Sequence, residues 1–217
     1  MKQVNKGASP AAFERWKALA NDDWQPCYAE LQNPEKTLLH TALLQEQGHV
    51  CCYCGRQISL TDSHIEHWRP QALRKDLELD YSNLLASCLR ASQPGAPLHC
   101  GHAKGNAFIE GHTLSPLDPG CELRFAYHLN GAISAARPDD QAAIDMIALL
   151  QLDIAFLRNR RSEALTRVFD AAFLNTASDD ELRTLATVYR QLDPDSGQHA
   201  DFGHALALFA EALLPET

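Results

Sequence analysis

The sequence predicts an α+β fold that is mainly α-helical, on three observations. Apolar residues recur at helical spacing in both terminal parts of the chain, whereas the middle holds only short apolar stretches and a hairpin signal follows them. Cysteines and histidines gather in that middle part. The 217 residues, 45% of them hydrophobic, suffice for a real core. We divide the chain into N-terminal helices over 1–47, a central segment over 48–135 and a C-terminal helical region over 136–217.

Two helices are expected before the central segment. Each begins at a proline preceded by a residue that can cap a helix, in Ser9-Pro10 and Asn33-Pro34. Apolar residues then follow at intervals of three and four, which gives each helix one apolar face. These signals predict helices over 10–20 and 34–47, and Gly48 is placed to end the second.

The helical period breaks between residues 48 and 112, where Gly, Pro, Cys and His dominate. Short apolar stretches at 58–60 and 84–85 predict small strands or turns. A segment with so little apolar surface would hold its shape poorly alone, and a bound metal ion would supply what its core lacks.

The C-terminal part begins with a hairpin signal and continues as helices. Asn130-Gly131 between apolar residues is typical of a tight β-hairpin turn. The amphipathic stretch 143–169 predicts one long helix. Ser178 followed by Glu181 is a capping box that opens another helix, and 202–213 predicts a last short one.

The charge of the chain is unevenly distributed. The formal net charge is −9, which argues against a surface that binds nucleic acid broadly. Residues 113–217 hold eight Lys and Arg against sixteen Asp and Glu, whereas 51–112 hold six of each and five of the ten histidines. The N-terminal MKQVNKGASP has no apolar core of a signal peptide, and no apolar run reaches the roughly 18 residues of a membrane span. We therefore expect a cytoplasmic protein without a membrane segment.

Four of the seven cysteines have the spacing of two metal half-sites. Cys51-x-x-Cys54 can chelate one ion from a tight turn, and Cys88 and Cys100 can supply the second pair. Four thiolates would close a tetrahedral structural zinc site. The alternatives are buried thiols without a metal, or Cys52 in the place of Cys51.

Four motifs of the central segment resemble a known family. C-x-Y-C-G, H-I-E-H-W-R-P, L-x-Y-x-N-L-L-x-S-C and C-G-H-A-K-G-N are similar to the HNH endonucleases, which have a ββα-metal core. More narrowly they resemble the PtuB proteins, the nuclease partners of PtuA ATPases in Septu and retron anti-phage systems. The resemblance implies an HNH ββα-metal core on a zinc knuckle, flanked by helices. It also implies structural Zn²⁺, catalytic Mg²⁺ or Mn²⁺, and a PtuA-like ATPase partner.

Phosphodiester hydrolysis needs an activated water, a cation that binds the phosphate, and stabilisation of the negative charge on the leaving oxygen. By the resemblance, His67 is the general base, which suits an imidazole at cellular pH. Glu66 and His102 are the expected ligands of the divalent ion. Asn83 would orient the base or hold its loop, and Lys104 would contact the phosphate.

Some alternatives stay open. The stretched spacing between Cys88 and Cys100 makes His99 a rival of His102 as metal ligand. His64 could support the site by contacting the metal ligands without binding the ion itself. The substrate is DNA or, in a retron system with a reverse transcriptase and its RNA-linked DNA, tRNA. A zinc-stabilised adaptor subunit without catalysis is the non-enzymatic alternative.

Overall fold

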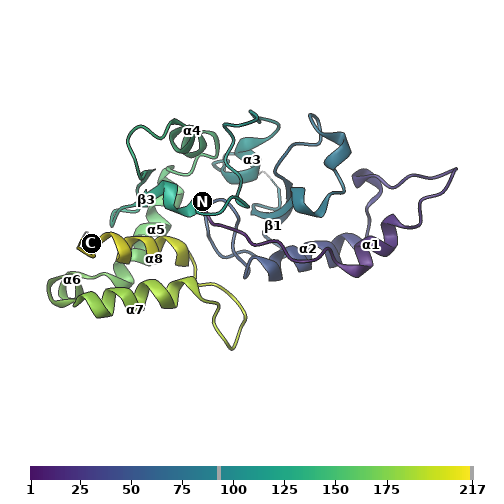
Figure 1. The fold of residues 1–217 in the computed structure, drawn as a ribbon. Coiled ribbons are helices and arrows are strands. Elements are labelled where there is room, and N and C mark those ends of the chain that lie inside the picture. The colour runs from purple at the N-terminus through teal and green to yellow at the C-terminus, as the bar shows by residue number, and fades with distance from the viewer. Residues whose placement is uncertain (92–93, 216–217) are drawn as a thin grey trace.

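Helices at both ends of the chain enclose a central part with two small antiparallel sheets (Figure 1). The computed structural model describes residues 1–91 and 94–215. This architecture confirms the predicted α+β, mainly helical class. In chain order the helices and strands are α1 (Ala11–Lys17), α2 (Glu35–Glu46), β1 (Ser63–His67), β2 (Leu84–Cys88), α3 (Cys100–Lys104), β3 (Phe125–Tyr127), β4 (Ile133–Ala135), α4 (Gln141–Leu149), α5 (Ala155–Val168), α6 (Ala171–Thr176), α7 (Asp179–Arg190) and α8 (Gly203–Ala212).

Both N-terminal helices form where the prolines predict them, and both are shorter than predicted. The prolines themselves, Pro10 and Pro34, occupy the N-cap positions, and no side chain caps either helix. Gly48 follows the end of α2 with a φ of 59°, as expected for a residue that ends a helix. The buried side of α2, including Leu39 and Leu43, packs against the β1–β2 hairpin.

The β1–β2 hairpin is the framework of the central segment. Its strands pair antiparallel from Ser63 opposite Cys88 to His67 opposite Leu84. Leu84 thus begins a strand as predicted. The stretch 58–60 forms no strand and ends in a turn over 60–62, and Gln57 makes only an isolated bridge to Val50. The short helix α3 packs on β2. Because side chains alternate along a strand, neighbouring residues of β1 face opposite sides of the hairpin.

The second hairpin, β3–β4, confirms the turn predicted at Asn130-Gly131. Gly131 has a φ of 77°, and a Cβ atom built on it would lie 1.9 Å from the carbonyl oxygen of Arg158. Glycine is therefore required here both by the backbone conformation and by the close approach of α5.

The prediction of one helix over 143–169 is wrong, because the stretch forms α4 and α5 with a break between them. Gln151 has a φ of 52° in the break. The carbonyl groups exposed there find partners outside the helix: Leu150 accepts from the backbone N–H of Cys100, and Leu152 from the guanidinium of Arg161, each at 2.8 Å. These tertiary hydrogen bonds replace those of a continuous helix and join the break to α3.

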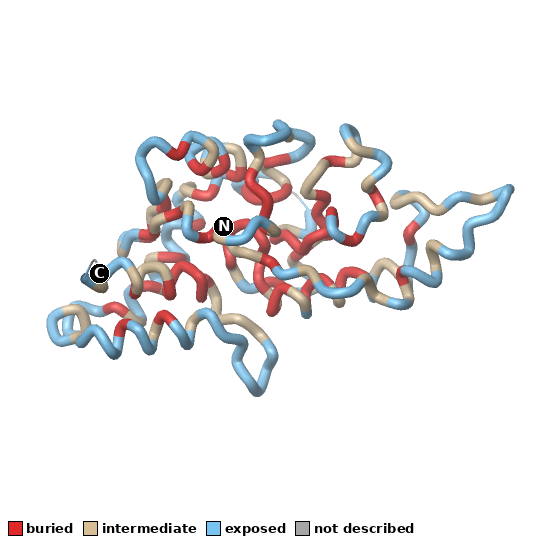
Figure 2. The backbone as a smooth tube through the Cα atoms, in the orientation of Figure 1, coloured by how far each residue is buried: buried red, intermediate tan, exposed pale blue. Residues whose placement is uncertain are grey.

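The C-terminal helices form a second, smaller core. The capping box of Ser178 and Glu181 forms at the start of α7 as predicted, and α7 packs against α8. Figure 2 shows that buried segments run through the middle of the molecule, whereas the loops and the outer faces of the terminal helices are exposed. The main core therefore surrounds the β1–β2 hairpin and the cysteines. No helix in the described ranges is long and apolar enough to cross a membrane.

Candidate active site and cysteine cluster

Four cysteine side chains meet beside the β1–β2 hairpin. Cys51 and Cys54 lie in one tight turn, Cys88 ends β2 and Cys100 begins α3. Their Sγ atoms all lie within 4.8 Å of one another, and all four residues are buried. Among the described residues, this is the one group of three or more Cys, His, Asp and Glu side chains whose ligand atoms lie so close together. Cys52 is buried too but is not part of the group.

The cluster has the geometry and charge that a tetrahedral metal site needs. Cys54 Sγ and Cys88 Sγ are 3.8 Å apart. A tetrahedral ion with metal–sulfur bonds of about 2.3 Å separates its ligands by about 3.8 Å. Burial alone would raise the pKa of Cys51, but hydrogen bonds from the other thiols lower it well below its ordinary value. The shared hydrogen bonds thus favour ionisation of one thiol, and these four cysteines could bind a metal ion such as zinc.

A second polar cluster lies on the face of β1 that carries Glu66. The Oε1 atom of Glu66 lies 2.9 Å from the ammonium of Lys104 and 3.1 Å from the hydroxyl of Tyr53. Its Oε2 atom lies 3.2 Å from Nε2 of His64. The side chains of Glu66 and Lys104 are only 8% and 1% exposed, so this is a buried ion pair.

Two imidazoles complete this cluster. The rings of His64 and His102 have centroids 4.6 Å apart, and both donate a hydrogen bond to the carbonyl oxygen of Leu89. Nε2 of His64 also faces Glu66, so both of its nitrogens lie against oxygen acceptors, an arrangement that favours the protonated ring. His102 uses Nε2 for its hydrogen bond, which leaves a lone pair on Nδ1.

The charges of the cluster favour an ionised carboxylate. Burial would raise the pKa of Glu66, but hydrogen bonds and positive charge from His64 and Lys104 outweigh burial and lower it. Burial would likewise lower the pKa of His64, but Glu66 raises it. Burial lowers the pKa of His102, and so does the neighbouring His64. The result is an anionic oxygen donor beside a neutral imidazole.

Gly101 lets α3 approach this cluster closely. A Cβ atom at this position would lie 2.4 Å from Oε2 of Glu66 and 2.7 Å from Nε2 of His64. Gly101 also donates its backbone N–H to Ser87 Oγ at 3.1 Å. A side chain here would occupy the space of the carboxylate, so glycine is needed for the cluster to form.

His67 lies on the opposite face of β1 from Glu66. Its Nε2–H donates to the carbonyl oxygen of Glu78 at 3.0 Å, and its ring meets the ring of Tyr28 edge to face, with centroids 4.5 Å apart. The lone pair therefore lies on Nδ1, which accepts from the amide of Gln71 at 3.1 Å. Burial lowers the pKa of His67, so the ring is neutral near pH 7. A neutral imidazole with its N–H fixed by a carbonyl is arranged to take up a proton at Nδ1.

Asn83 holds the loop that follows His67. Its Oδ1 accepts the backbone N–H of Arg69 at 2.7 Å, and its Nδ2 donates to the carbonyl oxygens of Arg69 and Leu77. Lys104 reaches the same region, because its ammonium also donates to the carbonyl oxygen of His67 at 3.1 Å. These two buried side chains therefore fix the backbone on both sides of the turn after β1.

The structure thus brings together some of the expected site residues and separates others. Glu66 and Lys104 pair directly, His102 adjoins them through His64, and His67 lies on the other face of β1. His99 lies at the cysteine cluster, with Nδ1 within 3.4 Å of Cys88 Sγ and 3.2 Å of Cys100 Sγ, and not beside Glu66.

Several neighbours of the expected residues belong to the site more closely than the sequence indicates. His64, expected only to support the site, contacts Glu66 directly and adjoins His102. Tyr53 belongs to the C-x-Y-C-G motif without a role expected for it, and no pattern in the sequence marks Gln71. The alternation of side chains along β1 could have placed His64 beside Glu66, because residues two apart in a strand lie on the same face. The partners of Tyr53 and Gln71 follow from tertiary packing.

Comparison with known proteins supports a nuclease in general terms. No protein-family model matches the chain. The chain is 25% identical over 146 residues to a Vibrio cholerae (serotype O1 biovar El Tor) protein named "Retron Vc95 putative HNH endonuclease". The similar part covers 63% of this chain and 69% of that protein. This similarity supports an HNH endonuclease family in general terms.

Proposed function

We propose that the chain is a metal-dependent HNH endonuclease of the PtuB type, which hydrolyses phosphodiester bonds of nucleic acid. The observation that carries the proposal is the pair of adjacent residues Glu66 and His67. The first is a carboxylate whose pKa is lowered by His64 and Lys104, and His64 in turn contacts His102. The second is a neutral imidazole with its proton-accepting nitrogen defined by a backbone carbonyl. The similarity to the Vibrio protein and the four motifs support the same assignment.

His67 is the proposed general base. Because Nε2–H is fixed on the carbonyl oxygen of Glu78, Nδ1 takes the proton of the attacking water, and the carbonyl stabilises the imidazolium that forms. The amide of Gln71 now occupies Nδ1 and would yield to that water. Asn83 keeps the following loop in place, so we assign it a positioning role.

Glu66 and His102 are the proposed ligands of a catalytic Mg²⁺ or Mn²⁺ ion. Hard divalent ions prefer oxygen donors and keep several water or phosphate ligands, so one carboxylate and one imidazole suffice on the protein side. Such an ion, when bound, stabilises negative charge on the phosphate and on the leaving oxygen. Lys104 keeps Glu66 ionised and in place through their buried ion pair, and we assign it that positioning role.

The proposed role of the cysteine cluster is to hold a structural Zn²⁺ ion. The four sulfur donors fit zinc, and all four residues are buried, as in sites that keep no open position. Such an ion would tie the turn at Cys51 and Cys54 to the ends of β2 and α3. It would thereby form the zinc knuckle beneath an HNH ββα-metal core of β1, β2 and α3.

The proposed partners follow from the resemblance and from charge. A chain with net charge −9 has little long-range electrostatic attraction for the negatively charged phosphates of nucleic acid. We propose that a PtuA-like ATPase supplies the missing positive surface, and that the chain is the effector of an anti-phage system. In a retron system the reverse transcriptase and its RNA-linked DNA would belong to the same assembly.

The test is cleavage by the purified chain, alone and together with the proposed PtuA-like ATPase. Plasmid DNA and total tRNA are offered with Mg²⁺ or Mn²⁺. General-base catalysis contributes about 10²–10⁴-fold, so His67→Ala should lose activity by that factor. His112→Ala removes an exposed histidine and serves as the control. The substrate that is cut decides between DNase and RNase. Equal activity of His67→Ala and wild type would contradict the assignment, and no cleavage in any combination would favour the adaptor.

A further inference from the structure

A cavity of about 400 Å³ lies between α2 and the beginning of β1. This volume is in the range of small-ligand sites. Its walls combine polar side chains, cations and one aromatic ring, and the ones that matter here are Tyr28, Lys36, His40, Ser63, His64 and Arg90.

The charges that line the cavity favour an anion. None of the residues that line it is acidic, although the chain as a whole carries nine net negative charges. Lys36 and Arg90 form no ion pair with any carboxylate of residues 1–91 and 94–215. Two cations without a carboxylate partner, in a recess of an acidic protein, favour a phosphate group.

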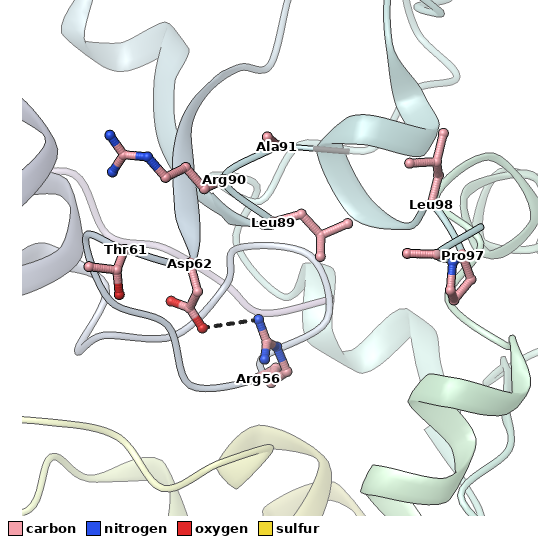
Figure 3. Close-up of a pocket in the computed structure, with 9 residues that line it drawn as sticks. Arg56, Thr61, Asp62, Leu89, Arg90, Ala91, Pro97 and Leu98 are labelled. Carbon is pink, nitrogen blue, oxygen red and sulfur yellow. Dashed lines mark hydrogen bonds and ion pairs between the residues drawn. The ribbon is translucent and has the colours of Figure 1, made fainter. Parts of the chain in front are cut away.

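A neighbouring cavity shows the contrast. It has about 430 Å³ and is lined by Arg56, Asp62 and the apolar Leu98, among others (Figure 3). There Asp62 neutralises Arg56, with 3.3 Å between the charged atoms. Figure 3 also shows the side chain of Arg90 extending away from Leu98. Arg90 lines both cavities. In the cavity beside α2 the second cation is Lys36, which has no acidic partner, whereas in the neighbouring cavity it is Arg56, which pairs with Asp62.

The same walls offer groups for a nucleoside. His40 Nε2 donates to Ser63 Oγ at 2.9 Å, which leaves a lone pair on Nδ1. Burial, with His64, Arg90 and Lys36, lowers the pKa of His40 to about 4, so this nitrogen stays an acceptor at neutral pH. Lys36 lies over the ring of Tyr28, 4.9 Å from its centroid, so its ammonium is held at the wall.

The cavity adjoins both halves of the proposed active site. His64 lines it and contacts Glu66, and Tyr28 lines it and contacts His67. A phosphodiester positioned at Glu66 and His67 would therefore extend its next nucleotide toward the cavity.

We propose that this cavity binds one unpaired nucleotide next to the scissile bond, with its phosphate on Lys36 and Arg90. The inference rests on the proposed nuclease function and specifies its substrate as nucleic acid with an unpaired nucleotide at the cut. A cavity of this volume has room for one unpaired nucleotide, whereas a base-paired duplex is too wide to enter it.

The test compares the Lys36→Ala/Arg90→Ala double variant with Arg15→Ala/Arg137→Ala. The control removes two cations outside the cavity that also lack an ion pair among the described residues, so both variants change the net charge equally. Binding of fluorescein-labelled single-stranded DNA and RNA of one sequence, and of the corresponding DNA duplex, is followed by anisotropy over a range of salt concentrations without added divalent ion. Hydrolysis of bis(p-nitrophenyl) phosphate with Mn²⁺ reports on the catalytic groups without a nucleoside.

The cavity variant should bind the single strands about tenfold more weakly than the control variant does. Its slope of log affinity against log salt should be smaller by about 0.7 for each phosphate that the variant no longer neutralises. Its hydrolysis of the small phosphodiester should match the control, and its affinity for the duplex should fall less than for the single strand.

Equal weakening by both double variants, wild-type affinity of the cavity variant, or an equal loss of affinity for duplex and single strand would overturn the inference. Failure of the wild type to hydrolyse bis(p-nitrophenyl) phosphate would count against the nuclease function alone, because the binding measurement still decides about the cavity. Weakening on DNA, on RNA or on both supports the inference and names the source of the nucleotide.

Discussion

Replacing one cysteine of the cluster should cost far more than replacing an equally buried cysteine elsewhere. Cys88 ends β2, and its backbone N–H donates to the sulfur of Cys51 at 3.4 Å. Cys121 is buried outside the cluster and donates to the carbonyl oxygen of Pro116. Both Cys→Ser substitutions bury a hydroxyl group in place of a thiol. Only Cys88→Ser removes a ligand from the proposed zinc ion.

The size of the difference follows from the two environments. A buried hydroxyl costs about 1–3 kcal/mol when poorly paired, and Ser at position 121 keeps the acceptor that the thiol now uses. A structural zinc ion contributes on the order of 10–16 kcal/mol of apparent binding free energy. Whole domains are stable by only about 5–15 kcal/mol. Cys88→Ser should therefore unfold the region around the β1–β2 hairpin, whereas Cys121→Ser should leave it folded.

The measurements are metal content by mass spectrometry and the urea midpoint of unfolding. Wild type and Cys121→Ser should each carry about one zinc ion per chain, as one tetrahedral site requires, and Cys88→Ser should carry almost none. A chelator should lower the urea midpoint of the wild type in the same way. Metal-free wild type with an unchanged midpoint, or equal midpoints for the two variants, would refute the zinc assignment and favour unliganded buried thiols.

Two further predictions concern the polar clusters. The folded-state pKa of His40, lowered by burial and nearby cations to about 4, lies below the ordinary 6.5 of the unfolded chain. The unfolded chain therefore binds the proton first, so this residue should reduce stability as pH falls from 6.5 to 4. The urea midpoint is measured at about pH 7 and about pH 5, on either side of the ordinary histidine pKa. Between these two pH values the midpoint of His40→Gln should fall less than the midpoint of the wild type. An equal fall would count against this account. Gly101→Ala places a Cβ 2.4 Å from the carboxylate of Glu66 and 2.7 Å from His64. Because a misplacement of about 1 Å can cost on the order of 100-fold in rate, cleavage should fall that far, and the urea midpoint should fall too because the shift disturbs the buried ion pair of Glu66 and Lys104. Gly7→Ala, with its nearest atom at an ordinary 3.4 Å, is the control, and full activity of Gly101→Ala would show that the cluster is dispensable.

Local signals in the sequence predicted the elements that depend on local interactions. The capping box of Ser178 and Glu181 and the turn at Asn130-Gly131 form because the residues that stabilise them are neighbours in the chain. The spacing of the cysteines likewise predicted which four would meet, since a Cys-x-x-Cys turn brings two sulfurs together by itself.

The sequence could not predict features that depend on distant partners. The stretch 143–169 has a helical pattern throughout, and it breaks because Cys100 and Arg161 satisfy the carbonyl groups of Leu150 and Leu152. The need for glycine at position 101 was equally hidden, because the atoms it must avoid belong to β1. Periodicity describes which side of an element is apolar, and it carries no information about which backbone groups will meet.

The alternation of β1 also constrains how a nuclease could work here. Glu66 and His67 are adjacent, so their side chains lie on opposite faces of one strand. One phosphate can reach both only around an edge of that strand. In the described part of the chain β1 pairs with β2 alone, so its other edge has no strand partner.

The cavity beside α2 lies along this strand, and two residues of its wall each contact one half of the site. His64 contacts Glu66, and Tyr28 contacts His67. A substrate that follows the edge of β1 past this cavity would bring its phosphate both to Glu66, the proposed metal ligand, and to His67, the proposed base. The adjacency of Glu66 and His67 therefore agrees with the proposed unpaired nucleotide, because a single strand is thin enough to follow the edge of β1.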